Sequence, residues 1–424
     1  MNIMIVGGGA REHALAWKLR QSPLTGRVFI APGNAGITKL AEALPIAIDD
    51  IEGLLMAARQ HDIDLTVVGP EGPLAAGIVD SFQELGLAIF GPTKGATQIE
   101  SSKSFAKDLM QRYSIPCARG EAFDSPSKAR AFIDRMELPV VVKANGLAAG
   151  KGVVVATTRE EAVKAVTDFM EFKVLGQAGE LIIVEEYLEG QEVSVFCFSD
   201  GEHLSPLVAA CDYKRAYDGD KGPNTGGMGS YSPPRFWDHN LDREIRKAVM
   251  EPTVAALARE GYPYKGILYG GLMLTRNGPQ VLEFNSRLGD PEAQVILPRL
   301  HGDLAEITLA VASGNLTGSS IEWADSDLSC VGVVMVSGGY PGDYRRGVPI
   351  SGLDSVQQNA LVYHGGTKLI ESPQTNESTI VTDGGRVLTV VGLGTSLQDA
   401  QARAYQTVHQ IHFEDCFYRQ DIAM

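Results

Sequence analysis

A carboxylate, an amide and a guanidinium occupy alternate positions in a stretch of the chain that we expect to form a strand. Glu283, Asn285 and Arg287 would share one face of this strand, because successive side chains point to opposite faces. Leu282 and Phe284 would lie on the other face. Carboxylate and amide oxygens are ligands of Mg²⁺, which takes one or two protein ligands besides phosphate oxygens. Glu283 and Asn285 are therefore candidate metal ligands, although an ordinary polar surface strand is the alternative.

A second segment combines two lysines with very small residues. Lys143 ends a predicted strand, the loop 144–150 contains mostly Gly and Ala, and Lys151 follows it. Small residues let backbone amides approach a polyphosphate, and ammonium groups offset its charge. The spacing departs from the P-loop pattern, which has one more residue and a Ser or Thr after the lysine. The segment predicts a flap over phosphates, with a mobile surface hairpin as the alternative.

Polar residues also follow two other predicted strands. Glu185 and Glu192 belong to the stretch EEYLEGQE, where exposed backbone can bind an adenine edge and a carboxylate can bind ribose hydroxyls. A solvated charge cluster is the alternative. Asp212 and Lys214 precede residues 218–234, which we expect to be a long irregular segment. Its glycine-rich run either wraps an anion or is a disordered connector.

The first glycine-rich turn, Gly7-Gly8-Gly9, follows a strand and opens a helix, so backbone N–H groups could hold a phosphate there. A purely structural tight turn is the alternative. The dinucleotide-binding fingerprint needs a further glycine where this chain has Glu12, and an acidic residue at the second strand, which is absent. Both departures weigh against a nicotinamide cofactor.

The elements that would position these residues indicate an α/β protein. In residues 1–100, short apolar strands alternate with helices, which predicts a doubly wound parallel sheet. The expected strands are 2–6, 28–30, 65–68 and 88–90, and the expected helices are 11–20, 54–60 and 74–85. Loops 7–9, 31–36 and 69–72 should line one crevice where these strands end.

Later elements suggest two further regions. Residues 115–190 form a small unit with helices near 126–135 and 159–171 and strands at 140–143, 152–156 and 181–185. Further strands are expected at 193–199, 207–210, 270–275 and 280–285, and a final helix near 397–411. We expect domains at 1–100, 101–324 (with the flap unit at 115–190) and 325–424, the last being strand-rich and α+β.

Composition excludes several classes of function. The 424 residues carry a net charge of −15 without a basic arm, which disfavours nucleic-acid binding. No apolar run reaches the ~18 residues of a membrane span, and the N-terminus lacks the features of a signal peptide. The five cysteines are scattered, which suggests reduced thiols in a cytoplasmic protein and neither a disulfide framework nor a zinc site.

These motifs together resemble a known family. Lys143 with its flap, EE-x-x-x-G-x-E and the E-x-N strand are similar to the nucleotide site of the ATP-grasp superfamily. The strings GGGAREHAL, APGNAG, GPEGPLAAGIVD, VKANGLAAGKGV, GPNTGGMGSYSP, EFNSRLGDPE and GGRVL more narrowly resemble the phosphoribosylamine–glycine ligase family (glycinamide ribonucleotide synthetases). Departures are small: Asn145 stands where the family usually has Asp, and Ser286 where it usually has Val.

The resemblance implies a fold, a reaction and a set of partners. It implies an ATP-grasp core with a mobile flap, and ligation of glycine to 5-phosphoribosylamine with ATP converted to ADP and phosphate through glycyl phosphate. This is the second step of de novo purine synthesis. Mg²⁺ or Mn²⁺ would be the cofactor, the chain would be a monomer, and no later pathway domain would be fused to it.

The resemblance also implies roles for individual residues. Glu283 and Asn285 would hold Mg²⁺, Arg287 would steady the developing acyl phosphate, and Asp290 would hold the glycine ammonium. Residues expected to bind ATP are Lys103, Lys143 and Lys151 at the phosphates, Glu185 and Leu188 at adenine, and Glu192 at ribose. Residues expected around the sugar phosphate are Gly8, Gly9, Asn34, Glu71, Asp212 and Lys214.

Three other functions remain open at this point. The chain could be a different ATP-grasp carboxylate–amine ligase or carboxylase of purine metabolism. It could also be an ATP-binding module without turnover, although the intact set Lys143, Glu283, Asn285 and Arg287 argues against that. A dinucleotide oxidoreductase is the third, disfavoured by Glu12.

Overall fold

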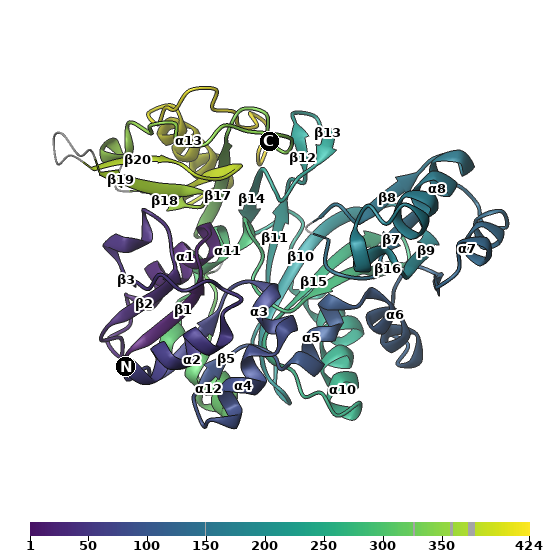
Figure 1. The fold of residues 1–424 in the computed structure, drawn as a ribbon, viewed down its shortest axis with the longest axis horizontal. Coiled ribbons are helices and arrows are strands. Elements are labelled where there is room, and N and C mark those ends of the chain that lie inside the picture. Colours follow the sequence, from purple (N-terminus) through teal and green to yellow (C-terminus); the bar gives the residue numbers. More distant parts are fainter. Residues whose placement is uncertain (149, 325–326, 357–358, 372–377) are drawn as a thin grey trace.

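The computed structural model describes residues 1–148, 150–324, 327–356, 359–371 and 378–424. Its N-terminal part is the predicted doubly wound parallel sheet, with strand order β3-β2-β1-β4-β5 (Figure 1). The strands are β1 (Ile3–Gly7), β2 (Val28–Pro32), β3 (Glu42–Ala43), β4 (Leu65–Val68) and β5 (Ile89–Phe90). Helix α1 (Ala10–Leu19) covers one face, while α2 (Ile51–Gln60) and α4 (Ile78–Glu84) pack on the other.

One predicted N-terminal helix is two helices in the structure. We expected a single helix over 74–85, but α3 (Glu71–Ala76) ends at Gly77 and α4 begins directly after it. Gly77 has φ +100°, a left-handed conformation that stops a right-handed helix and that glycine adopts without steric cost. The break lets Glu71 begin its own short helix at the end of β4.

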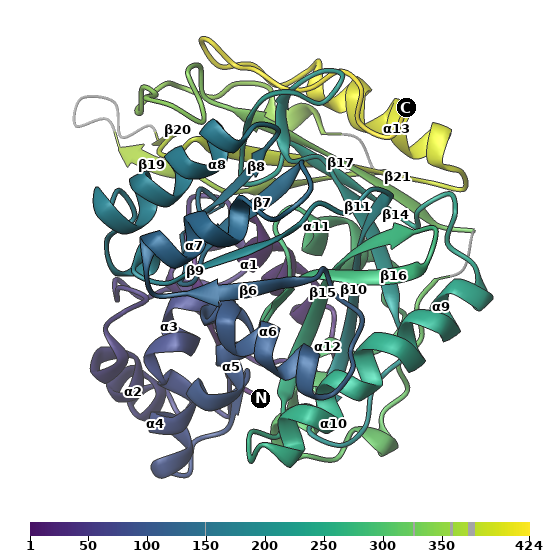
Figure 2. The ribbon, with the colours of Figure 1, turned by 90° about the vertical axis from the view of Figure 1, so that its right-hand side faces the viewer.

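The flap unit is a four-stranded antiparallel sheet with two helices on its outer face (Figure 2). Its order is β6 (Gly120–Phe123), β9 (Ile182–Glu186), β7 (Val140–Ala144) and β8 (Val153–Ala156). Helices α7 (Pro126–Ile133) and α8 (Arg159–Val166) bury Val140 and Val142 on that face. Because side chains alternate along β7, Lys143 points to the opposite face, toward the rest of the molecule. The predicted loop 144–150 includes Ala149, which lies outside the described residues.

A single eight-stranded sheet runs through the remaining chain. Its order is β16 (Gly278–Asn285), β15 (Lys265–Thr275), β10 (Gln191–Asp200), β11 (Val208–Asp212), β14 (Gly229–Ser232), β17 (Ser329–Val336), β21 (Arg386–Gly394) and β18 (Ala360–His364). The sheet therefore continues across the domain boundary that we expected near residue 325. Figure 1 shows it leading from the flap side of the molecule toward the C-terminal strands.

The remaining elements surround this sheet. Two hairpins lie apart from it: β12 (Arg215–Tyr217) with β13 (Lys221–Asn224), and β19 (Thr367–Glu371) with β20 (Ser378–Thr382). The helices are α5 (Lys94–Ser101), α6 (Lys103–Arg112), α9 (His239–Ile245), α10 (Glu251–Arg259), α11 (Glu292–Ile296), α12 (Leu304–Ser313) and the predicted C-terminal α13 (Leu397–Val408).

The prediction that residues 218–234 are irregular is wrong. This segment contains β13 and β14, and β14 is an interior strand that pairs with β11 on one side and β17 on the other. Its four residues are Gly, Ser, Tyr and Ser, which have little intrinsic preference for strands apart from the tyrosine. Pairing with β11 and β17, and not the preference of its own residues, therefore makes this segment a strand.

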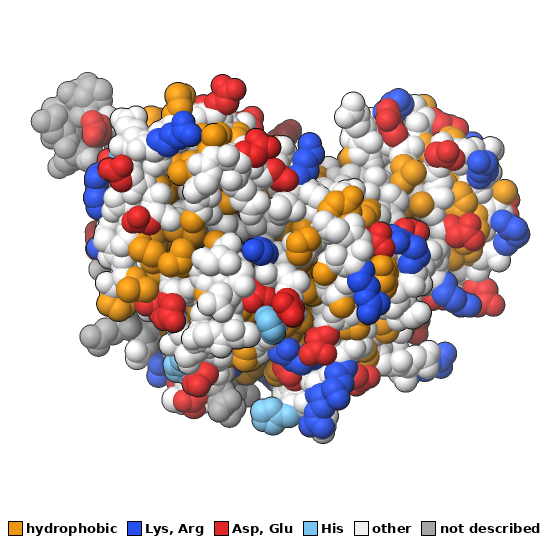
Figure 3. Space-filling view, turned by 90° about the horizontal axis from the view of Figure 1, so that it is seen from below, with side chains coloured by type: hydrophobic (Ala, Val, Ile, Leu, Met, Phe, Trp, Pro, Cys, Tyr) orange, Lys and Arg blue, Asp and Glu red, His pale blue; other side chains and the backbone are white. Residues whose placement is uncertain are grey.

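Three findings bear on the compositional predictions. Within the described part of the chain no helix is both long enough and apolar enough to cross a membrane, and all five cysteines are free thiols. On the face seen from below, Lys and Arg side chains are interspersed with Asp and Glu rather than gathered in one basic patch (Figure 3).

The junction between the N-terminal sheet and the C-terminal strands contains two buried histidines. His13 on α1 accepts a hydrogen bond at Nδ1 from the backbone N–H of His364 on β18, at 2.9 Å. Burial, the neighbouring His364 and Lys39 lower the pKa of His13 to about 3, and burial and Lys39 lower that of His364 to about 4. Both imidazoles are therefore neutral in the folded protein near pH 7.

These histidines should make stability sensitive to mild acid. Below pH 6.5 the unfolded chain binds protons at both rings while the folded chain does not. Stability is therefore lost as pH falls from 6.5 toward the folded-state pKa values, by up to about 1.4 kcal/mol per pH unit per ring. Urea unfolding at pH 7.5 and pH 5.0 measures how far the free energy of unfolding falls between the two pH values. We expect this decrease to be smaller in His13→Gln than in the wild type, by about 2 kcal/mol. The exposed control His301→Gln should behave as wild type, and equal pH dependence of His13→Gln and wild type would contradict the assignment.

Candidate functional site

Strand β16 carries the predicted metal ligands, but not in a strictly alternating pattern. Glu283 lies opposite Gly271 and Asn285 opposite Tyr269 on β15, and the register then slips so that Val281 faces Leu272. Because of this bulge, Val281 and Phe284 both pack into the same core, although they are three residues apart. The predicted regular alternation, with Leu282 and Phe284 on one face of the strand, is therefore broken by the bulge at Leu282.

The side chains of Glu283 and Asn285 form no hydrogen bond or ion pair with any described residue. Burial alone would raise the pKa of Glu283, but the surrounding positive charges outweigh burial and lower it. These cations, in decreasing order of effect, are Lys214, Lys103, Lys143 and Arg287. Glu283 is therefore an ionised carboxylate whose oxygens are not engaged by a protein donor, as a hard cation requires of its ligand.

Lys143 is held in place by two contacts. Its Nζ donates to the carbonyl of Leu282 at 3.0 Å and forms an ion pair with Glu185. On its other side, the Glu185 carboxylate pairs with Lys107 at 2.7 Å, and Lys107 also donates to the carbonyl of Ala118 at 2.6 Å. Lys107 was not predicted as a site residue, although it lies four residues after Lys103 on α6 and thus shares its helix face.

The residues predicted to bind adenine and ribose have distinct environments. The backbone of Glu185 is paired in the flap sheet with Gly120 on one side and Val141 on the other. Leu188 follows the end of β9 and is half-buried. Glu192 on β10 forms an ion pair with Lys214.

The ion pair between Glu192 and Lys214 joins the residue predicted to bind ribose to the residues predicted to bind the sugar phosphate. Burial raises the pKa of Asp212 on β11, an effect that Lys214 opposes and that the carboxylates of Glu292 and Glu192 reinforce. The predicted ribose-binding residue Glu192 and the predicted sugar-phosphate residues Asp212 and Lys214 therefore form one half-buried cluster.

Lys103 begins α6, and the flap loop caps that helix. The side-chain oxygen of Asn145 accepts from the N–H of Ser104 at 2.8 Å, and the carbonyl of Asn145 accepts from the N–H of Lys103 at 3.0 Å. Burial is the largest influence on Lys103 and lowers its pKa, which nearby carboxylates partly offset. Lys151 is exposed on the flap. Asn145 thus caps the start of α6 through both its side-chain and its backbone oxygen.

Arg287 lies just beyond the end of β16, between two carboxylates. It pairs with Glu71 of α3 at 3.1 Å and with Glu100 of α5 at 2.9 Å. Glu100 also accepts hydrogen bonds from Ser286, from its backbone N–H at 2.8 Å and from its hydroxyl at 2.6 Å. Glu100 was not predicted, because no local pattern marks it. A small cavity lined by Ser286, Arg287 and Gly69 adjoins this contact.

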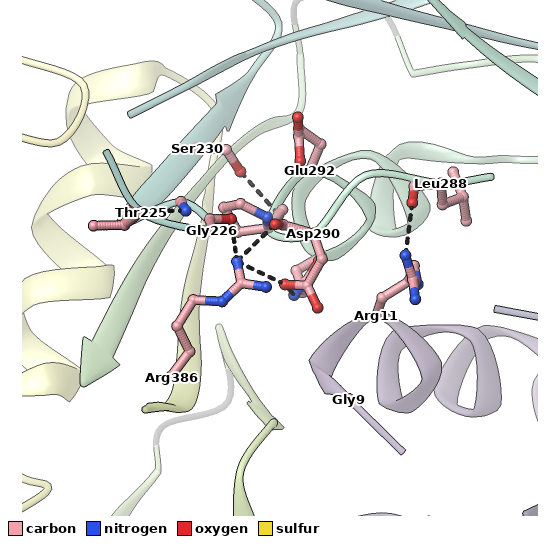
Figure 4. A network of polar contacts seen from close by, with 12 residues as sticks. Gly9, Arg11, Thr225, Gly226, Ser230, Leu288, Asp290, Glu292 and Arg386 are labelled. Carbon is pink, nitrogen blue, oxygen red and sulfur yellow. Dashed lines mark hydrogen bonds and ion pairs between the residues drawn. The ribbon is translucent and has the colours of Figure 1, made fainter. Parts of the chain in front are cut away.

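Asp290 is held from two sides, and Figure 4 shows its contact with Arg386. Gln294 donates to its carboxylate at 2.8 Å, and Arg386 of β21 lies 3.4 Å from the same oxygen. Burial would raise the pKa of Asp290, but Arg386 and Arg11 lower it overall. Glu292, two residues later, accepts from the hydroxyl of Tyr269 at 2.9 Å.

At the predicted phosphate site at the start of α1, one of the backbone amides is engaged within the protein. The N–H of Gly9 donates to the carboxylate of Glu12 at 2.6 Å, so this amide is engaged within the protein. Asn34 donates from its amide to the carbonyls of Gly8 at 2.8 Å and His364 at 2.6 Å. The loops at the strand ends do meet, as predicted. Their polar groups bind one another, and a Cβ at Gly9 would lie 3.5 Å from an oxygen of Asp290.

The arrangement suits transfer of a phosphoryl group. The charges of Lys103, Lys143 and Arg287 act on the carboxylate of Glu283 in β16, so positive charge and two candidate metal ligands lie close together. Within the described residues there is no group of three or more His, Cys, Asp and Glu side chains that could hold a metal. A site with one carboxylate and one amide fits Mg²⁺, which shares its coordination with phosphate oxygens and water.

Comparison with known proteins places the chain in one family. Family models of phosphoribosylglycinamide synthetase match in three parts: the N domain at residues 1–100, the ATP-grasp (A) domain at 101–293 and the C domain at 330–424. The chain is 48% identical over 427 residues to the phosphoribosylamine–glycine ligase of Escherichia coli strain K12, covering 100% of this chain and 98% of that protein. It is 49% identical over 425 residues to a trifunctional purine biosynthetic protein of Gallus gallus, covering 99% of this chain and 42% of that protein.

Solved structures agree with this result. The phosphoribosylamine–glycine ligase of Thermotoga maritima superposes with a TM-score of 0.87 at 31% identity, covering 100% of both chains. A biotin carboxylase of Campylobacter jejuni superposes with a TM-score of 0.70 at 16% identity, covering 97% of this chain and 92% of that one, and shows that the fold is shared.

The contacts of Glu100 lead to a prediction about stability. Glu100→Gln would leave the buried guanidinium of Arg287 with one carboxylate instead of two, and we expect a loss of about 3 kcal/mol in the free energy of unfolding. Ser286→Val removes a single hydrogen bond to the same carboxylate and should cost about 1 kcal/mol. Urea denaturation of both variants measures the difference, and equal losses would show that Glu100 does not bind Arg287 as described.

Proposed function

The chain belongs to the phosphoribosylglycinamide synthetase family, and on that premise we propose that it joins glycine to 5-phospho-D-ribosylamine at the expense of ATP. The products would be glycinamide ribonucleotide, ADP and phosphate, in the second step of de novo purine synthesis. The observation that carries the proposal is the unengaged carboxylate–amide pair of Glu283 and Asn285 among Lys103, Lys143 and Arg287. These side chains could neutralise the negative charge of a triphosphate, which activates its terminal phosphorus toward attack.

The metal and the nucleotide would share the space between β16 and the flap. Glu283 and Asn285 would hold Mg²⁺ or Mn²⁺, which when bound would supply positive charge that neutralises part of the charge of the triphosphate. Lys103 and Lys143 would contact the phosphates, and Lys151 would reach them when the flap closes. The end of β9 would present adenine contacts at Glu185 and Leu188, and Glu192 would bind ribose.

The two other substrates would lie on the side of Arg287 and Asp290. The Asp290 carboxylate would hold the ammonium of glycine, and Arg287 would stabilise charge on the acyl phosphate. Asp212, Lys214 and Glu71 would close the sugar-phosphate side. Gly8, Gly9 and Asn34 would shape the loop against which the sugar lies, with most of their polar groups already bonded within the protein.

The reaction then needs no covalent enzyme intermediate. A carboxylate oxygen of glycine attacks the γ-phosphorus of ATP, a new P–O bond forms, and the bond to the bridging oxygen breaks to release ADP. The nitrogen of ribosylamine attacks the acyl carbon of glycyl phosphate, loses a proton, and displaces phosphate. Positioning and charge neutralisation supply the catalysis. A closed flap would keep water from hydrolysing the acyl phosphate.

The substrate requirement tests this proposal. We expect ADP release to require glycine and freshly generated 5-phosphoribosylamine together, because the acyl phosphate has no acceptor otherwise. The assay omits each substrate in turn and replaces glycine by formate or bicarbonate. Release that depends on formate or bicarbonate instead of glycine would assign the chain to a different ATP-grasp ligase or carboxylase, and no release with any acid would leave an ATP-binding module.

Replacement of the metal ligand tests the site itself. Glu283→Ala removes the carboxylate of the pair, and we expect turnover to fall at least about 100-fold at ordinary magnesium concentrations. Direct titration with Mn²⁺ in the presence of ADP should show weakened metal binding. Glu84→Gln, on the exposed surface of α4, is the matched control and should leave both measurements unchanged. Near-normal turnover by Glu283→Ala would rule out the metal assignment.

A further inference from the structure

A single arginine from the C-terminal strands contacts two separate loops of the candidate site. Arg386 is the first residue of β21, and its Nη1 nitrogen donates to the carbonyl of Asp290 at 2.7 Å and to the carbonyl of Gly226. The same nitrogen lies 3.4 Å from the carboxylate of Asp290. Figure 4 shows the guanidinium between the two loops.

Gly226 is held by the C-terminal region on both of its backbone polar groups. Its N–H donates to the hydroxyl of Tyr340 at 3.0 Å, while its carbonyl accepts from Arg386. A Cβ at Gly226 would lie 3.1 Å from the Arg386 guanidinium carbon, which is tighter than ordinary van der Waals contact. The absence of a side chain therefore lets the guanidinium lie directly against the loop backbone.

The two loops also pack against each other. A Cβ at Gly227, which has φ +113°, would lie 2.4 Å from the ring of Pro291. Ser230 donates to the carbonyl of Pro291 at 2.9 Å. The loop around Gly226 and the loop that carries Asp290 are thus one packed unit, which Arg386 ties to the C-terminal sheet.

The packed unit formed by the loops of Gly226 and Asp290 approaches other parts of the candidate site at two places. One carboxylate oxygen of Asp290 lies 3.5 Å from the position of a Cβ on Gly9, so Asp290 meets the N-terminal loop. The carbonyl of Thr225 lies 3.7 Å from the position of a Cβ on Gly150 of the flap loop. The unit therefore connects the C-terminal strands with both the expected glycine-binding carboxylate and the flap.

We infer that Arg386 is a positioning residue for the glycine-binding part of the site. It acts through Asp290 and Gly226, which it holds in one arrangement, and it does not itself bind the substrate. The inference rests on the proposed function for the part that Asp290 plays toward glycine. All three contacts come from one nitrogen, so the ammonium of a lysine could supply the same donors from a slightly shorter arm.

Kinetics of three variants test the positioning role. For Arg386→Gln we expect the KM for glycine to rise about tenfold or more with the KM for ATP within twofold of wild type, since a charge-assisted contact to the Asp290 loop is lost. Arg386→Lys should recover most of the affinity for glycine. Arg345→Gln removes an exposed arginine of the same region, paired with Glu414, and should match wild type.

A second measurement does not depend on turnover. Hydrogen exchange of the unligated protein should be faster in Arg386→Gln at amides 225–229 and 289–294, and unchanged in the flap helices. Equal rises in the KM for glycine and ATP, or no recovery in Arg386→Lys, would overturn the inference. If the wild type shows no glycine-dependent release of ADP, the proposed function fails. Hydrogen exchange then decides alone, and unchanged exchange in the two segments would overturn the positioning role.

Discussion

Charge compensation in a buried place is the constraint on which this site depends. Several cations and carboxylates lie out of water here, and an uncompensated buried charge is costly. The chain resolves this by alternating the signs: Lys107, Glu185 and Lys143 form one run, and Glu71, Arg287 and Glu100 form another. Glu283 is the carboxylate that the surrounding cations keep ionised without a direct partner among the described residues.

A triphosphate would disturb this balance. It brings several negative charges to lysines that already have carboxylate partners, so the site can accept it only with further positive charge. Under the proposed function, Glu283 and Asn285 would provide the place for that charge. The same arrangement that allows the folded protein to bury its lysines would then create the need for a divalent cation with the nucleotide.

Local patterns were sufficient to predict the N-terminal parallel sheet, the flap strands and the residues of β16, because each depends on neighbours in the sequence. The bulge in β16 depends instead on its pairing with Gly271, and the buried strand β14 depends on β11 and β17, which are distant in the chain. The composition of a glycine- and serine-rich segment is the same in a loop and in a strand that distant strands pair with, so composition does not distinguish the two. The sequence alone therefore predicts an irregular segment there.

Glu100 and Arg386 were missed for the same reason, whereas Lys107 has a local signal in its position four residues after Lys103. Glu100 and Arg386 act through partners about 190 and 100 residues away, and no local spacing connects them. The glycine-rich turn at Gly9 suggested a phosphate site, but Glu12 reaches back three residues and takes that amide. At this helix start, the carboxylate of Glu12 is the anion that the amide of Gly9 binds.

The position of β14 also bears on how the chain folds during synthesis. β14 is complete by residue 232, but its partner β17 begins at residue 329. On the ribosome, about a hundred residues must be added before that side of the strand can be covered, and an open strand edge can pair with other chains. Its short length of four residues and its lack of aliphatic side chains limit this hazard, because a brief, polar edge makes a poor template for aggregation. Weak strand preference in β14 thus protects the nascent chain.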